Sequence, residues 1–126
     1  MSLRCLIVDD NADFLQAARD LLERDGLEVV AVATTGDEAM AGAAELRPDV
    51  ILVDLYLANE SGFDLAQRLS DTAGPVPSPI VLISTYAQRD LEELVTASPA
   101  VGFLSKGELS GTAIRSALGL EDSRPG

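Results

Sequence analysis

The sequence predicts an α/β protein: a doubly wound parallel sheet of five strands with helices on both faces. Five short stretches are rich in apolar residues, and the run from Val50 to Val53 is aliphatic along its whole length, which is typical of a strand buried on both faces of a parallel sheet. Each run is followed by a stretch with apolar residues at helical spacing, and this alternation favours right-handed crossovers between parallel strands. A length of 126 residues, 47% of them hydrophobic, suits one domain with a substantial core.

Three strand–helix pairs are predicted in the first part of the chain. The strands are expected at residues 3–8, 27–33 and 50–53, the second of them rich in valine. Gly26 ends the first helix and Pro48 follows the end of the second, while Ser61 is placed to cap the third. One face of each helix is apolar, in chain order Phe14, Ala18, Leu21 and Leu22; Ala39, Met40, Ala43 and Leu46; Phe63, Ala66 and Leu69.

Two more pairs follow residues 73–79, a proline-rich stretch that we interpret as a stiff connection and not as a linker between domains. The strands are predicted at residues 80–83 and 101–104, and Ser110 can cap the last helix. The apolar faces of these helices are Leu91, Leu94 and Val95, and Ala113, Ile114, Ala117 and Leu118. We therefore expect one domain over residues 1–120 and a disordered tail over residues 121–126.

Charge and composition exclude several classes of function. Nine basic residues stand against 21 acidic ones, a formal charge of −12, which argues against direct binding of nucleic acid. No apolar run is long enough to span a membrane or typical of a signal peptide, and the single cysteine, Cys5, is expected to lie in the core of a protein in the reducing cytoplasm. The chain has no histidine, which excludes Ser-His-Asp triads and histidine-based metal sites.

Polar side chains stand at the carboxyl ends of four predicted strands. Asp9 and Asp10 follow the first strand, Asp54 the third, Ser84 the fourth, and Lys106 comes shortly after the fifth. The strand order 2-1-3-4-5, common for doubly wound sheets of this size, makes strands one and three neighbours and places ligands at this edge. We expect the three acids to converge there, with Ser84 and Lys106 beside them.

These residue types suit phosphoryl transfer to a carboxylate. Three close carboxylates repel one another, and a divalent cation such as Mg²⁺ or Mn²⁺ removes that conflict. An ionised Asp54 beside the cation can attack a phosphoryl group, while Lys106 and Ser84 stabilise its equatorial oxygens. Each residue also has a simpler interpretation: Asp9 and Asp10 as a helix cap, Asp54 as a turn residue, Ser84 as a strand-end hydroxyl and Lys106 as a solvated charge.

Four stretches, residues 6–10, 50–54, 81–84 and 102–106, together resemble the receiver domain of two-component response regulators. The similarity runs from Leu3 to about Leu118 and includes Gly62, eight residues after Asp54. It implies the flavodoxin-like (βα)5 receiver fold. It also implies that Asp54 becomes a 4-aspartylphosphate, with a sensor histidine kinase or a His-phosphotransfer protein as the donor of the phosphoryl group.

The same resemblance assigns roles to the remaining site residues. Asp9, Asp10, Asp54 and the main-chain carbonyl of Tyr56 would hold Mg²⁺. Ser84 and Lys106 would contact the phosphoryl group, and Phe103 would be the rotating aromatic switch. The face formed by the fourth helix, fifth strand and fifth helix would then change and bind an output protein that the sequence does not name, or a second copy in a homodimer. The chain would assist only its own phosphorylation and hydrolysis.

Several residues depart from the pattern usual in this family. Gly107 follows Lys106 where proline is usual, so we expect a trans peptide there, and Ala58 replaces a frequent proline. Thr85 is larger than the usual residue and is expected to restrict access to the phosphoryl group. Tyr56 and Tyr86 flank Asp54; they either shield its acyl phosphate from water or are partly buried packing residues.

Other functions stay open from the residues alone. The chain could be a receiver from a longer DNA-binding transcriptional regulator. An aspartate-nucleophile phosphatase usually carries a second aspartate two residues after the first, where this chain has Tyr56. A flavodoxin-like cofactor binder would need a phosphate-binding loop after the first strand, where Asp9 and Asp10 would repel phosphate. A degenerate receiver would lack one of the site residues.

Overall fold

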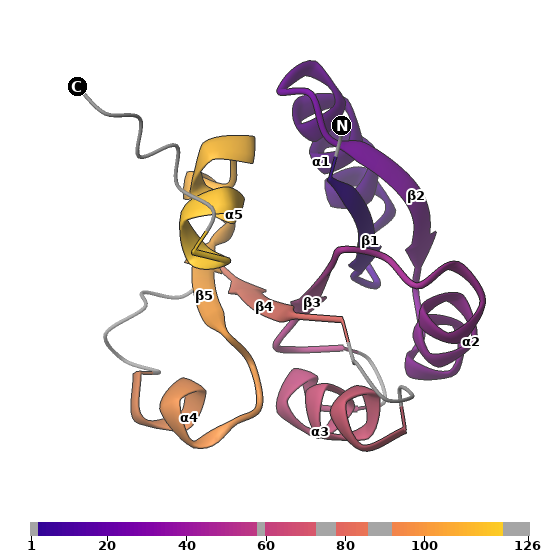
Figure 1. Cartoon of the computed structure of the whole chain (residues 1–126), viewed down its shortest axis with the longest axis vertical. Helices are drawn as coiled ribbons and strands as arrows, with labels where there is room; N and C mark the ends of the chain where they lie inside the picture. The colour runs from indigo at the N-terminus through magenta and orange to yellow at the C-terminus, as the bar shows by residue number, and fades with distance from the viewer. Residues whose placement is uncertain (1–2, 58–59, 73–77, 86–91, 120–126) are drawn as a thin grey trace.

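The computed structural model describes residues 3–57, 60–72, 78–85 and 92–119 (Figure 1). Its centre is a five-stranded sheet in the order β2-β1-β3-β4-β5, with every neighbouring pair parallel. This confirms the predicted fold class and strand order. The strands are β1 (Arg4–Val8), β2 (Glu28–Ala33), β3 (Val50–Asp54), β4 (Ile80–Ser84) and β5 (Gly102–Ser105).

Within the described residues, five α-helices cover the two faces of the sheet, and Figure 1 shows α1 and α5 on one side and α2, α3 and α4 on the other. They are α1 (Ala12–Arg24), α2 (Gly36–Leu46), α3 (Gly62–Thr72), α4 (Glu92–Ala97) and α5 (Gly111–Ala117). A short 3₁₀ helix, η2 (Lys106–Glu108), was not predicted. Some of the predictions concern residues outside the described ones, namely Ala58, residues 73–77, Tyr86, Leu91 and the tail from 121 to 126.

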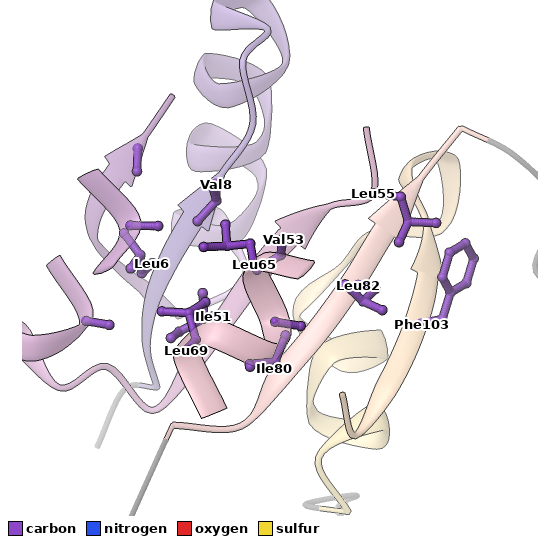
Figure 2. Close-up of a cluster of buried hydrophobic side chains, with 14 residues drawn as sticks. Leu6, Val8, Ile51, Val53, Leu55, Leu65, Leu69, Ile80, Leu82 and Phe103 are labelled. Carbon is purple, nitrogen blue, oxygen red and sulfur yellow. The ribbon is translucent and has the colours of Figure 1, made fainter. Parts of the chain in front are cut away.

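The central strands supply two cores, because successive side chains of a strand point to opposite faces. In β3, Ile51 and Val53 join the core under α2, α3 and α4, while Val50 and Leu52 join the core under α1 and α5. Figure 2 shows the first of these cores, including Phe103 from β5. The continuous aliphatic runs of the sequence are therefore explained by burial on both faces of the strands.

Side-chain caps determine where the helices begin. Asn11 Oδ1 accepts a hydrogen bond from the Phe14 amide at 3.1 Å, and Thr35 Oγ1 accepts one from the Glu38 amide at 3.1 Å. Ser110 Oγ accepts from the Ala113 amide at 3.0 Å, which confirms it as the cap of α5. Each cap satisfies one of the amides that a helix leaves unpaired at its N-terminus.

Two polar contacts join helices across the fold. Asp25 Oδ2, at the end of α1, accepts a 2.8 Å hydrogen bond from the Gly111 amide at the start of α5. Arg68 on α3 binds both carboxylate oxygens of Glu60 at 2.8 Å and Asp37 Oδ1 on α2 at 3.2 Å. The second contact ties the loop between β3 and α3 to two helices.

Among the described residues, no helix combines the length and the apolar character that crossing a membrane requires.

Candidate functional site

The register of the strands brings three acids to one point at the carboxyl edge of the sheet. Val8 of β1 pairs with Val53 of β3, so Asp9 and Asp54, the next residue in each segment, leave the sheet side by side. One oxygen from each of Asp9, Asp10 and Asp54 lies within 4.8 Å of the others. Asp9 and Asp54 are buried, with 0% and 6% exposure, while Asp10 is exposed. The predicted convergence of the acids is confirmed.

The backbone before α1 fixes Asp9 and leaves helix capping to another residue. The Asp9 amide donates to Ala33 O at 3.0 Å, and Asp9 Oδ1 accepts from the Asn11 amide at 2.8 Å. Asn11 is the N-cap of α1. The alternative in which the two aspartates cap the helix is therefore wrong, since Asn11 already has that role.

The loop after Asp54 is held in place by backbone contacts. The Leu55 amide donates to Ile83 O at 3.0 Å, the Gly62 amide donates to Leu55 O at 2.7 Å, and Tyr56 forms a β-bridge with Ser61. A Cβ at Gly62 would stand 2.3 Å from Asp54 O, closer than real Cβ contacts. Glycine is therefore required here by the close approach of two backbones.

The ammonium group of Lys106 reaches both buried acids. Ser84 and Ser105 pair at the ends of β4 and β5, so Lys106 follows directly at the same edge. Lys106 Nζ lies 2.5 Å from Asp9 Oδ2 and 3.5 Å from Asp54 Oδ1. Ser84 is fully buried at the end of β4. The structure thus brings Lys106 and the acids together. The interpretation of Lys106 as a solvated surface charge is wrong, because its side chain is only 15% exposed.

The surroundings of Asp54 make its negative charge costly. Burial, and next the neighbouring charge of Asp9, raise the pKa of Asp54 from 3.8 to about 6, while Lys106 lowers it. At pH 7 the carboxylate is still mostly ionised and can act as a nucleophile. A pKa raised by burial and by a neighbouring charge is common for carboxylates in functional sites.

The donor set fits a hard divalent cation. Although Asp9 Oδ2 forms an ion pair with Lys106, it accepts no hydrogen bond of good geometry within the described part of the chain. Carboxylate oxygens, here two buried acids and a third open to solvent, are the ligand type that Mg²⁺ and Mn²⁺ prefer. The acids therefore supply the oxygen ligands and the concentrated negative charge that such an ion binds.

For the residues around the acids, some predictions are confirmed and one is corrected. The Lys106–Gly107 peptide is trans, as expected. Phe103 is only 5% exposed and packs in the core, the inward position of the predicted switch. Tyr56 is 56% exposed, so its interpretation as a partly buried packing residue is wrong, because more than half of its surface faces solvent. Thr85 is exposed as well.

One contact at the site was missed by the sequence reasoning. The ring centroid of Phe14, which the helical spacing assigned only to a packing face, lies 4.3 Å from Lys106 Nζ. Residues 14 and 106 lie on segments far apart in the chain, and no local signal in the sequence indicates such a pair.

Comparison with known proteins identifies the family. The family described as "Response regulator receiver domain" matches residues 5–118. A protein-glutamate methylesterase/protein-glutamine glutaminase of Geobacter metallireducens is 36% identical over 79% of this chain, but the match covers 27% of that protein. The transcriptional regulatory protein PdtaR of Mycobacterium tuberculosis is 32% identical over 82% of this chain and 49% of its own length.

A solved structure has a similar fold. The response regulator of Burkholderia pseudomallei, crystallised with a phosphorylated aspartic acid, a calcium ion and citrate, has a TM-score of 0.76 and 30% identity over 93% of this chain and 66% of that one. The chain thus spans between about a quarter and a half of the length of the two curated relatives. By its sequence match and its fold, the chain belongs to the response regulator receiver domain family.

Proposed function

We propose that this receiver domain is a phosphorylation switch in which Asp54 accepts a phosphoryl group from a phosphohistidine of a partner protein. The observation that carries the proposal is the cluster that Asp54 forms with two further acids and the Lys106 ammonium. Receiver domains bind Mg²⁺ at an acidic pocket, and here Asp9, Asp10, Asp54 and the Tyr56 carbonyl would hold it. When bound, Mg²⁺ would neutralise charge on the transferred phosphoryl oxygens.

The chain's own residues account for the transfer. An ionised oxygen of Asp54 attacks the phosphorus in line, the new O–P bond forms as the P–N bond to the donor imidazole breaks, and the imidazole takes up a proton as it leaves. The Lys106 ammonium is close enough to stabilise one phosphoryl oxygen, and the buried Ser84 hydroxyl, at the end of the next strand, another. The chain contains no histidine, so the phosphohistidine belongs to a sensor kinase or a His-phosphotransfer protein.

The switch itself would involve Ser84 and Phe103. Ser84 lies at the end of β4, whose residues pair with those of β5, and Phe103 lies on β5 packed inward. A shift of Ser84 toward a phosphorylated Asp54 would alter the space around β5 and thereby the face of α4, β5 and α5. That face would bind the output partner or a second copy of the chain.

The output of the whole protein is also a proposal, because the relatives extend well beyond the matched region. One is named for methylesterase and glutaminase activity and another for transcriptional regulation. We propose that this receiver itself has no activity beyond assisting its own phosphorylation and hydrolysis, and that it controls its partner through protein contacts. The phosphorylated aspartic acid in the Burkholderia pseudomallei structure supports this chemistry for a protein of similar sequence and fold.

The direct test is incubation with acetyl phosphate and Mg²⁺, followed by intact-mass measurement. We expect one phosphoryl adduct in the native chain, none in Asp54→Asn, and a strongly reduced yield when EDTA removes the cation. Asp20→Asn, an exposed aspartate on α1, is the matched control and should be phosphorylated normally. Absence of the adduct in the native chain, or its persistence in Asp54→Asn, would refute the proposal.

A further inference from the structure

Lys106 needs a restraint that its own segment does not supply. It is the single lysine of the chain, and it begins the short helix η2 just beyond an edge strand of four residues. The next residue, Gly107, is exposed, and a Cβ placed there would have Ser105 Oγ, at 3.9 Å, as its neighbour. The backbone around Lys106 is therefore lightly packed, although its ammonium must stand at one place to meet a phosphoryl oxygen.

Phe14 supplies such a restraint from a different element. Its amide is fixed by the Asn11 cap of α1, and its half-buried ring packs against the core between α1, α5 and the sheet. The ring centroid lies 4.3 Å from Lys106 Nζ, within the range in which an aromatic face attracts a cation. The Lys106 side chain is only 15% exposed, which strengthens that attraction because little water screens it.

The ring differs from the other neighbours of the ammonium in one respect. Asp9 and Asp54 also hold Lys106 in this structure, but a bound cation would compete for both carboxylates, and phosphorylation would convert the Asp54 carboxylate to an acyl phosphate. The attraction of an aromatic face depends on neither event. The ring can thus hold the ammonium at the edge of the site while the carboxylates exchange their partners.

We infer that Phe14 is a positioning residue that holds the Lys106 ammonium in place for the phosphoryl group on Asp54. The inference rests on the proposed function for its consequence in phosphoryl transfer, but the contact between ring and ammonium can be tested by itself. The competing interpretation is that Phe14 only fills space under α1. Phe14→Leu separates the two, because leucine keeps an apolar side chain of related size and removes the aromatic face, whereas Phe14→Tyr keeps that face.

The first measurement is the NMR signal of the lysine ε-methylene group in protein labelled with ¹³C-lysine. Because the chain has one lysine, one signal reports on Lys106. The ring current of Phe14 should place its protons at higher field than in a free lysine. Phe14→Leu should remove this shift and Phe14→Tyr should retain it. Leu21→Ala, a half-buried position on the same helix, controls for a loss of packing and should leave the signal in place.

The second measurement is the rate of Asp54 phosphorylation by acetyl phosphate with Mg²⁺. Phe14→Leu should slow the reaction roughly threefold to tenfold, the effect of losing one cation–π contact, while Phe14→Tyr and Leu21→Ala should stay within about twofold. If Phe14 acts through Lys106, then Phe14→Leu should have no further effect in a Lys106→Ala background.

The outcomes distinguish this inference from the proposed function. A lysine signal that is unchanged in Phe14→Leu, or a slowing of equal size in the Lys106→Ala background, would overturn the positioning role while leaving Asp54 as the acceptor. A native chain that shows the ring-current shift but takes up no phosphoryl group would overturn the proposed function and leave the contact established.

Discussion

Replacing Asp54 by asparagine is expected to stabilise the cation-free protein at pH 8. Folding raises the pKa of this carboxylate from 3.8 to about 6, with burial and then the charge of Asp9 as the main causes. A shift of about 2 units corresponds to about 3 kcal/mol, and solvent screening at the open edge of the site reduces this to roughly 1–2 kcal/mol. Asparagine has a similar shape and no charge, so the free energy of unfolding should rise by that amount.

The stabilisation should depend on pH with a defined sign. The folded pKa of Asp54 lies above the unfolded one, so between about pH 4 and pH 6 the folded state binds more protons than the unfolded state and stability falls as pH rises. Above pH 6 the full cost of the ionised carboxylate is present, and below pH 4 it is absent. The difference between Asp54→Asn and the native chain should therefore be largest at pH 7–8 and should vanish near pH 4.

Thermal unfolding followed by circular dichroism measures this effect. For a domain of this size 1–2 kcal/mol corresponds to a rise in Tm of roughly 4–8 °C. Asp20→Asn removes one exposed charge and should change stability by less than about 0.5 kcal/mol. Added Mg²⁺ should stabilise the native chain more than Asp54→Asn, because it binds the ionised form. A Tm of Asp54→Asn equal to or below that of the native chain at pH 8 would refute the reasoning.

Three further changes have defined outcomes. Gly62→Ala should lower the free energy of unfolding by about 1–3 kcal/mol or more, because its Cβ would stand 2.3 Å from the backbone oxygen of Asp54. Gly107→Ala is the control, because a Cβ there has no close neighbour. Equal urea midpoints for the two variants would contradict the steric argument. Asp25→Ala should lower the free energy of unfolding in urea by about 1–2 kcal/mol, because it removes the 2.8 Å hydrogen bond from the Gly111 amide at the start of α5. An unchanged urea midpoint would show that this hydrogen bond does not stabilise the fold. Changing Tyr56 and Tyr86 to serine should shorten the lifetime of the phosphoryl adduct measured by intact mass, whereas an equal or longer lifetime would show that the rings do not shield it.

The fold could be predicted because its signals are local. Each strand contains a short apolar run, and in β1 and β3 the runs Leu6–Val8 and Val50–Val53 are wholly aliphatic. Such a run is removed from water only when both faces of the strand are covered. The alternation of these runs with helical spacing then restricts the topology to parallel strands with crossovers. The structure moved individual boundaries by one or two residues, for instance by including Asp54 in β3.

The convergence of the site could also be predicted, because parallel strands end at the same edge. Once Asp9, Asp54, Ser84 and Lys106 are placed at or just beyond strand ends, neighbouring strands bring them together without any detail of side-chain packing. The exposure of Tyr56 was not predictable in the same way, because a loop residue's burial depends on how the loop folds back through contacts such as the bridge to Ser61.

By itself the sequence determined that this chain forms a parallel α/β sheet and that Asp54 stands among acids at its carboxyl edge. Both features follow from the residue types and spacings within single strands and helices, together with the common order of such strands in a parallel sheet. Tertiary structure alone decided that the Lys106 ammonium contacts both the Asp9 carboxylate and the Phe14 ring. The physical reason is that such contacts join residues far apart in the chain, and their distances depend on strand register and on how α1 packs against the sheet.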